Sequence, residues 1–352
     1  MSFIDRVLQE PSYGWSRPNG QLVIPTRQQL WKEAFRRINI FKTRRNWTSI
    51  AGLLIIVSML PFFYGFLVYH FSLLTLLLFL FYTTVIMGTH GTIWYHRYCT
   101  HKAYTFSHPF WRFITKNLVI ATVPEETYVI SHHVHHAKAD KPGDPYNSKA
   151  GLLYCMLAEI NHQGINKNLS ENEYNKTAGM LGHTGIHLNT YKQYRRRGSI
   201  SSPIRVLAGL ILNWAFWYGV FYFCGGHALA CTIFSAAMFW LIFVRSFNFT
   251  GHGKGTEKHV EGIDFDHRSL AINQFRPGVL TGEWHNNHHL YPGSARAGFL
   301  PYQLDLAWIY IFVLYKLGGV SSYHDSKKEF LRKFKNNRQA PLQTENRTGK
   351  IQ

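Results

Sequence analysis

Two long stretches of this chain contain no charged side chain, and they restrict its fold more than any other feature of the sequence. Residues 50–96 and 206–244 hold no Lys, Arg, Asp or Glu, although the 352 residues include 38 basic and 19 acidic ones. A helix that crosses the ~30 Å hydrocarbon core of a bilayer needs about 20 apolar residues. Each stretch has room for two such helices, so the sequence predicts an all-α membrane protein with four transmembrane helices in two hairpins.

Polar breaks inside these stretches mark the expected turns. His70 interrupts the first stretch, and the sequence Gly225-Gly226-His227 interrupts the second. Glycine pairs favour turns because they adopt backbone angles that other residues avoid. The expected spans lie at about residues 50–69, 72–95, 206–224 and 228–247.

The basic residues indicate the orientation of the hairpins. Nine basic residues precede residue 50, fourteen fall in 97–205 and fourteen follow residue 249, within a net charge of +19. Two hairpins place all three segments on one side, and the positive-inside rule makes that side cytosolic. We expect both termini in the cytosol, at the endoplasmic reticulum in a eukaryote or the inner membrane in a bacterium. The cytosolic position of these segments explains the positive net charge. Because the sequence also contains no nucleic-acid-binding motif, a nucleic-acid partner is not expected.

The sequence divides into three parts. Residues 1–49 form a basic N-terminal arm, residues 50–325 the main domain, and residues 326–352 a basic tail that is expected to be largely disordered after Asn336. Within the main domain, an apolar helix at 304–317 contains Asp305 and Lys316 and is therefore expected to lie on the cap rather than to form a fifth span.

The N-terminal arm contains one predicted helix, at residues 26–41. Thr26 followed by Gln29 is a capping-box pattern, and apolar residues then recur at helical spacing. A basic amphipathic helix directly before a span favours a position on the membrane surface over packing on a soluble face. Its basic side chains, expected on the opposite side from the apolar ones, are Arg27, Lys32, Arg36 and Arg37.

Histidines gather in patterned clusters on the expected cytosolic side. The chain has 20 histidines, and nine of them fall in an HxxxxH, two HxxHH and one NxxxH pattern. Nine imidazoles exceed the four ligands of one zinc ion and suit two metal ions. The candidate ligands are His96, His101, His132, His135, His136, His252, His285, His288 and His289.

Helical geometry predicts how the ligands divide between the two ions. On a regular α-helix His96 and His101 lie about 140° apart, so we expect one on each ion. In the HxxHH patterns, adjacent histidines are expected to diverge to different ions. His133 points off the shared face of its pattern and is left out of the site. Asn248 lies four residues before His252, so both can face the same site.

The order of these motifs resembles the integral-membrane fatty acid desaturases, in particular the acyl-CoA desaturase type. The sequence Asp144-Pro145-Tyr146-Asn147 and the pair Gly282-Glu283 are also similar to that family. The resemblance covers about residues 50–325. It implies a cytosolic helical cap that holds two irons on the nine histidines, with Asn248 bound through a water molecule.

The resemblance also implies the reaction. O2 and two electrons remove two hydrogens from an acyl chain, carried by a membrane lipid or by acyl-CoA, and leave a cis double bond. The chain has no HPGG haem motif, so an external donor such as cytochrome b5 or ferredoxin, with its reductase, is expected. An acidic donor would suit the basic cytosolic face.

Two other functions fit the sequence. A di-iron membrane hydroxylase uses similar histidine patterns and leaves an alcohol. A non-enzymatic metal-binding or transport protein would place its ligands near the middle of the membrane. In this chain the histidine clusters lie at or beyond the ends of the expected spans.

Overall fold

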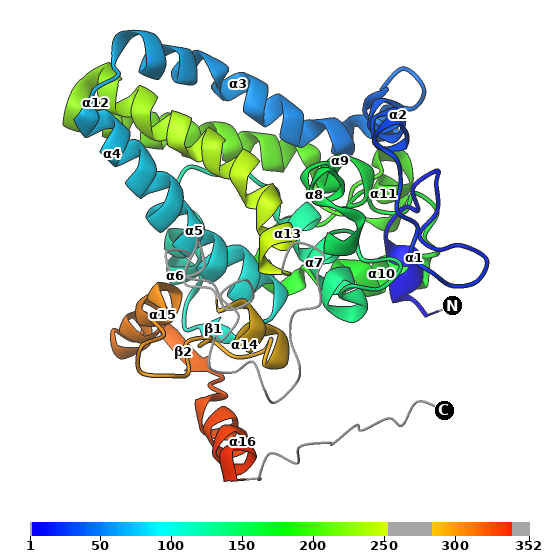
Figure 1. Ribbon diagram of the computed structural model, residues 1–352. Coiled ribbons are helices and arrows are strands. Elements are labelled where there is room, and N and C mark those ends of the chain that lie inside the picture. The colour runs from blue at the N-terminus through cyan, green and yellow to red at the C-terminus, as the bar shows by residue number, and fades with distance from the viewer. Residues whose placement is uncertain (1, 253–283, 340–352) are drawn as a thin grey trace, which may run out of the picture.

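The long helices of the protein gather at one end of the molecule and the short helices at the other (Figure 1). This computed structural model describes residues 2–252 and 284–339. Three helices of these residues are long and apolar enough to cross a membrane, which fits a membrane protein. Gly282 and Glu283, which precede the histidine pattern at residues 285–289, lie outside the described part of the chain.

The first two long helices form a hairpin. Helix α3, Trp47–Tyr69, ends at His70. The chain then continues as one helical rod from Leu73 to Thr100. Ser72 and Thr75 form a capping box at its start, which supports the turn expected at His70. The rod consists of α4 (Leu73–Phe81), η2 (Tyr82–Ile86), α5 (Met87–His90) and η3 (Gly91–Thr100), and η2 and η3 are π-helical.

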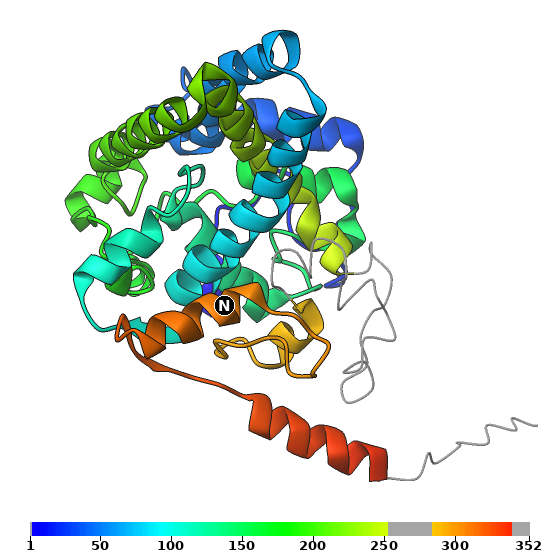
Figure 2. The same cartoon turned by 90° about the vertical axis from the view of Figure 1, so that its left-hand side faces the viewer.

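The third long helix, α12 (Pro203–Phe243), is itself a helical hairpin. Gly225 (φ −156°, ψ 22°) and Gly226 (φ 66°, ψ −165°) leave the helical region, and the positive φ favours glycine. The rings of Trp214 and Phe234 lie 5.9 Å apart, whereas 20 residues of straight helix would span about 30 Å. The chain therefore reverses at the predicted glycine pair, and the two halves diverge from the bend in Figure 2.

The two reversals lie together, far from the labelled chain ends (Figure 1). The rings of His70 and His227 are 5.6 Å apart. After its second half, α12 continues through η6 (Val244–Ser246) into α13 (Phe247–Gly251). Both hairpins thus return the chain toward the short helices, where the histidine patterns lie.

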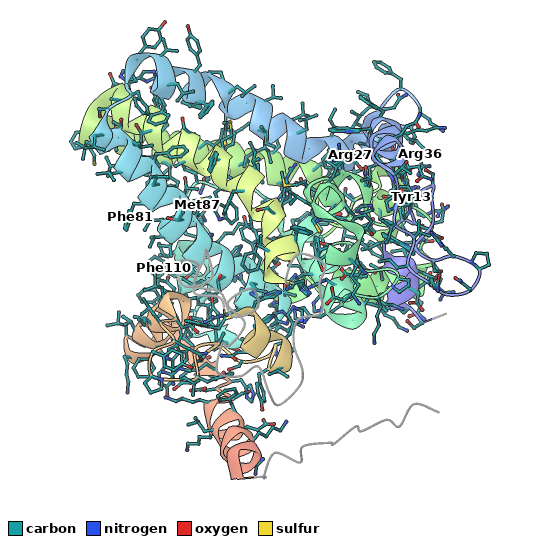
Figure 3. The ribbon with its side chains drawn as sticks, in the orientation of Figure 1. Tyr13, Arg27, Arg36, Phe81, Met87 and Phe110 are labelled. Carbon is teal, nitrogen blue, oxygen red and sulfur yellow. The ribbon has the colours of Figure 1, made fainter. Side chains whose placement is uncertain are left out.

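Apolar side chains cover the outside of the long helices. Leu54 and Val68 of α3 and Leu73 of α4 are 54%, 55% and 73% exposed. Phe81, which is also exposed, projects from the edge of the rod in Figure 3. A continuous exposed apolar surface of this kind fits lipid rather than water.

The short helices at the end of the molecule opposite the two reversals are called the cap below. The N-terminal arm packs closely against this cap. Helix α1, Ile4–Val7, buries Val7, and Gln9 donates its N–H to the carbonyl of Gly164 at 2.7 Å. Helix α2, Arg27–Ile38, begins with the predicted capping box of Thr26 and Gln29. It follows that the arm is a packed part of the fold.

One residue of α2 departs from the expected basic face. Arg37 is buried, and its Nε lies 2.6 Å from Oε1 of the buried Glu33. It also donates to the carbonyls of Gln9 and Glu10. Arg37 therefore faces the protein, because this carboxylate and these carbonyls compensate its burial. Arg27 and Arg36 lie on α2 near the edge of the molecule in Figure 3.

The cap contains short helices and a small sheet. Strands β1 (Tyr104–Phe106) and β2 (Val320–Tyr323) pair antiparallel, with Tyr104 opposite Tyr323. The expectation of an all-α protein is wrong in this detail, because two strands this short, far apart in sequence, leave no local pattern. The helices before the second hairpin are η1 (Arg44–Asn46), α6 (Pro109–Lys116), α7 (Glu125–Lys138), η4 (Ser148–Ala150), α8 (Leu152–Met156), α9 (Ala158–Asn161), α10 (Glu171–Gly179), η5 (Gly182–Thr184) and α11 (Tyr191–Arg197).

The C-terminal part completes the cap with α14 (His285–Leu290), α15 (Leu306–Lys316) and α16 (Lys327–Gln339). Helix α15 buries one face, including Ile311, and lies on the cap as expected. Asp305 does not lie inside this helix but caps its N-terminus, where it accepts the N–H of Trp308 at 2.9 Å. The tail expected to be largely disordered contains α16 through Gln339, and residues 340–352 lie outside the described part.

Candidate metal centre

The structure brings all nine predicted histidines together in two adjoining groups. Within each group the candidate ligand atoms lie within 4.8 Å of one another. The rings of His136 and His289, one from each group, have centroids 4.6 Å apart. Group one is His96, His101, His132, His136 and His288, and group two is His135, His252, His285 and His289.

The π-helix η3 explains why His96 and His101 share group one. The N–H of His101 donates to the carbonyl of His96 at 3.1 Å, an i→i−5 bond. This wider turn places residues five apart on the same side, and the two ring centroids are 4.9 Å apart. The expectation of one histidine for each ion is therefore wrong, because it assumed regular α-helical geometry.

Each HxxHH pattern places its adjacent histidines in different groups. On α7, His136 joins group one while its neighbour His135 joins group two. On α14, His288 joins group one while its neighbour His289 joins group two. Successive residues on a helix are about 100° apart, so each pattern contributes to both groups.

Two aspartates orient two of the four histidines of group two. Asp144 Oδ1 lies 2.9 Å from Nδ1 of His135, and Asp140 Oδ2 lies 3.1 Å from Nδ1 of His252. A carboxylate at Nδ1 holds the proton there and leaves Nε2 with a lone pair. Asp144 is itself fixed because it accepts the N–H groups of Asp140 and Tyr146, each at 2.9 Å.

Electrostatics favour uncharged rings for several histidines in each of the two groups. Burial, and then repulsion between neighbouring imidazoles, lowers the pKa of His132, His288 and His289 well below the usual value. The same causes lower the pKa of His136 to about 2. These rings are neutral at physiological pH, and the neutral ring is the form that binds a metal.

The residues fit metal ions in their spacing as well as their chemistry. The Nε2 atoms of His132 and His288 lie 3.1 and 3.0 Å from Nε2 of His136. If two nitrogens each bind one ion at about 2.1 Å and the nitrogen–metal–nitrogen angle is about 90°, the nitrogens lie about 3.0 Å apart. Buried Nε2 atoms of His101 and His135 also have no hydrogen-bond partner within the described chain. A metal ion would satisfy these buried atoms.

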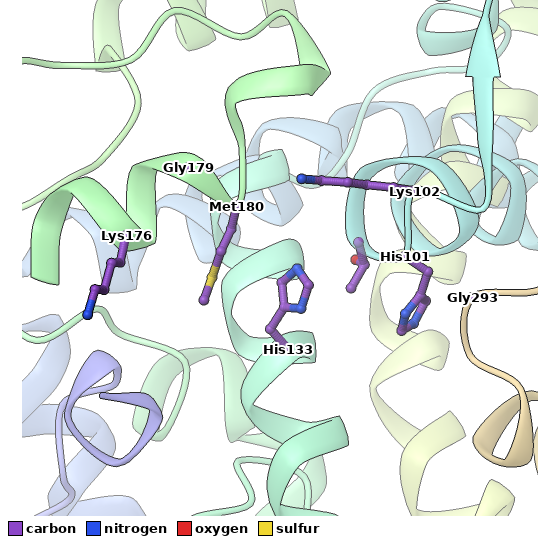
Figure 4. Close-up of a pocket in the computed structure, with 8 residues that line it drawn as sticks. His101, Lys102, His133, Lys176, Gly179, Met180 and Gly293 are labelled. Atoms are coloured by element: carbon purple, nitrogen blue, oxygen red, sulfur yellow. The ribbon is translucent and has the colours of Figure 1, made fainter. Parts of the chain in front are cut away.

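Asn248 and His133 lie beside the two groups. Asn248 sits on α13 one turn before His252, where its carbonyl accepts the N–H of His252 at 3.1 Å. His133 belongs to neither group of the described residues. It instead lines a cavity of about 430 Å³ together with His101 and Lys102 (Figure 4). Burial lowers the pKa of His133 to about 4.

Sequence reasoning missed two supporting residues. Asp140 carries no motif of its own, and it acts through contact with His252, 112 residues away. Asp305 forms a buried ion pair with Arg97 at 2.9 Å. An acidic residue beside a histidine pattern is a usable signal for the first case, since metal-binding histidines commonly donate to a carboxylate.

The sequence of the chain matches the model of one protein family. The family model described as fatty acid desaturase matches residues 72–321, which include the whole nine-histidine site. The chain belongs to the fatty acid desaturase family.

Individual relatives of this desaturase differ in their named substrates. It is 27% identical over 243 residues to an sn-1 stearoyl-lipid 9-desaturase of Synechocystis sp., covering 66% of this chain and 67% of the relative. It is 27% identical over 232 residues to an sn-2 palmitoyl-lipid 9-desaturase of Nostoc sp. (64% and 72%). It is 26% identical over 239 residues to an acyl-CoA C20 Delta5-desaturase of Anemone leveillei (66% and 69%).

Proposed function

We propose that this protein is an O2-dependent fatty acyl desaturase that introduces a cis double bond at a di-iron centre. The observation that carries the proposal is the convergence of nine buried or half-buried histidines into two adjoining groups in a member of the fatty acid desaturase family. The groups lie where both helical hairpins return to the cap. This place suits a reaction on a chain that enters from a membrane.

Each histidine group would hold one iron ion. Asn248 would contact the iron of group two through a water molecule. Bound iron would supply the redox chemistry that activates O2 and removes two hydrogens from the acyl chain. The chain's own part is to hold neutral imidazoles in place, with Asp144 and Asp140 fixing the rings of His135 and His252. Burial of the groups would keep bulk water away from the reacting carbons.

The protein would cross the membrane four times. The reversal of α12 at Gly225 and Gly226 supports two spans within that helix, and the rod and α3 supply the other two. With the N-terminal arm at residues 1–49, the main domain at 50–325 and the tail at 326–352, both termini would be cytosolic. The exposed Trp31 and Phe35 of α2 support a surface position for the arm's helix.

The substrate would be an acyl chain on a lipid or on coenzyme A, and the electrons would come from cytochrome b5 or ferredoxin with its reductase. The names of the relatives include both lipid and acyl-CoA substrates, so they support the acyl chain as the shared element. The basic cytosolic segments support an acidic donor.

The test is expression of the protein in a host that lacks unsaturated fatty acids, followed by mass spectrometry of its lipids. Products that lack two hydrogens support desaturation, whereas products that gain an oxygen indicate a hydroxylase. His136→Ala and His288→Ala should abolish the product, because each removes a ligand from group one. The matched control is His133→Ala, a neighbour on α7 outside both groups, which should retain the product.

A non-enzymatic metal-binding or transport protein would give a different result. In that case wild-type protein would leave the lipids unchanged while still binding metal in purified form. Unchanged lipid composition in cells that contain folded, iron-loaded protein would overturn the proposal.

A further inference from the structure

A third group of metal-binding side chains lies where the two hairpins reverse, at the other end of the long helices from the nine histidines. His70, His227 and Cys231 place one candidate ligand atom each within 4.8 Å of one another. We propose that these three residues form a separate binding site for a zinc ion. Neither the desaturase reaction nor the nine-histidine centre uses them.

The geometry of the pair on α12 suits a shared ion. His227 and Cys231 are four residues apart on the second half of α12, so they lie on one face. The Sγ of Cys231 is 3.3 Å from Nε2 of His227. Ligands at about 2.3 Å for sulfur and 2.1 Å for nitrogen, arranged tetrahedrally, would be about 3.6 Å apart. Little movement is needed to bring both atoms onto one ion.

The imidazole of His227 is already oriented for binding. Its Nδ1 lies 3.1 Å from the hydroxyl of Tyr218 on the first half of α12. If Nδ1–H donates to that hydroxyl, Nε2 keeps its lone pair and faces the thiol. Histidines that bind metals are commonly held through their other ring nitrogen in this manner.

Close packing of α3 shields the thiol. A Cβ added to Gly65 would lie 2.9 Å from Sγ of Cys231, so the glycine lets α3 pass directly over the sulfur. Cys231 is only 1% exposed, whereas His227 is exposed. An ion could enter from the side of His227, where a water molecule could supply the fourth ligand.

The donor set selects the metal. Two imidazoles and a thiolate suit zinc, which binds nitrogen and sulfur in tetrahedral sites. The nine-histidine centre offers imidazoles alone, so the two sites differ in chemistry. Zinc would displace the thiol proton of Cys231 to solvent. Because His70 ends α3 and the other two ligands belong to α12, the ion would join the two hairpins.

Cobalt(II) substituted for zinc in the purified full-length protein tests the proposal. A thiolate ligand gives a near-ultraviolet charge-transfer band that an all-imidazole site does not produce. The band should appear in the wild-type protein and disappear in Cys231→Ser. The matched control is Cys224→Ser, which removes an exposed thiol outside the group and should keep the band.

Two further variants separate binding from folding. Tyr218→Phe should weaken cobalt affinity by about 10- to 100-fold, as loss of a supporting partner typically does, while the band keeps its shape. His70→Gln should weaken the affinity at least as much without touching the thiol. Zinc should raise the Tm of the wild-type protein and of Cys224→Ser but not that of Cys231→Ser. A wild-type protein without the band, or a band that survives in Cys231→Ser, would overturn the site.

Discussion

Arg97 and Asp305 form a buried ion pair that ties the first histidine pattern to the chain beyond the third. The Arg97 Nη1 atom lies 2.9 Å from Asp305 Oδ1, and the two side chains are 1% and 2% exposed. The guanidinium also donates to the carbonyl of Ala295 at 2.7 Å. Oδ2 of Asp305 accepts the N–H groups of Ala297 and Gly298 at 2.7 and 3.1 Å. One carboxylate thus organises the segment between α14 and α15.

Breaking this pair should destabilise the whole protein. Asp305→Asn would leave the Arg97 charge buried without its counter-charge, which typically costs about 3–5 kcal/mol. The measurement is thermal or denaturant unfolding in detergent. Asp325→Asn is the control, because its 3.7 Å pair with Arg296 is partly exposed and should contribute at most about 1 kcal/mol. Equal losses for the two variants would contradict the role of Asp305.

The aspartate beside His135 should control metal affinity. In Asp144→Asn the side-chain amide can donate to Nδ1 of His135, which favours the proton on Nε2 and opposes binding. We expect an affinity for iron about 10- to 100-fold lower. Iron content at limiting iron measures the change. The control is Asp5→Asn, which removes an ion pair with Lys138 at the end of α7, the helix that carries His135. This variant should keep wild-type affinity. An Asp144→Asn protein that is unfolded, rather than folded and poor in iron, would not support the prediction.

His162 should make stability depend on pH. Its ring stacks on Tyr154 at 3.9 Å, and its Nε2 is hydrogen-bonded to the Tyr13 hydroxyl. Burial, and then the charge of Arg37, lowers the pKa of His162 to about 3. Below pH ~6.5 the unfolded chain takes up a proton that the folded chain refuses. This contribution to stability is complete above pH ~6.5 and is lost as the pH falls toward 3.

The variant His162→Gln isolates that contribution. Between about pH 6 and 4, the free energy of unfolding of the wild-type protein should fall more steeply than that of His162→Gln. The difference in slope should be about 1.4 kcal/mol per pH unit. Unfolding curves for both proteins at several pH values provide the comparison. Parallel pH profiles would mean that His162 is protonated in the folded protein.

Salt should slow electron delivery to the protein. The screening length falls from about 30 Å at 0.01 M salt to about 8 Å at physiological ionic strength, which weakens attraction between a basic face and an acidic donor. The rate of oxidation of reduced cytochrome b5 should therefore fall as salt rises. A neutral chemical reductant serves as the control and should show little change. A cytochrome b5 rate insensitive to salt would exclude charge steering.

Much of the architecture follows from local sequence rules. The charge-free stretches predicted the long helices, the glycines at 225 and 226 predicted a reversal, and Thr26 with Gln29 predicted a helix start. These features depend on neighbouring residues alone. That the nine patterned histidines lie close together was also predictable, because their patterns repeat.

The division of ligands between the two groups was not predictable in the same way. It depends on the π-helix η3, which is stabilised by packing between distant parts of the chain. A Cβ at Gly91 would lie 2.9 Å from the ring of Trp240, so α12 presses against the start of that turn. The burial of Arg37 and the pairing of β1 with β2 are also products of long-range contact. No period in the sequence encodes such contacts.

The pairing of Tyr104 with Tyr323 has a consequence for biosynthesis. The two strands are about 220 residues apart, which a ribosome takes roughly 10–40 s to translate. The segment that follows the first histidine pattern is therefore made well before the strand that pairs with it. A chain interrupted before residue 320 would keep its hairpins but lack the strand and the helix that close the cap. Iron that depends on the closed cap would have to be delivered after both strands have been made.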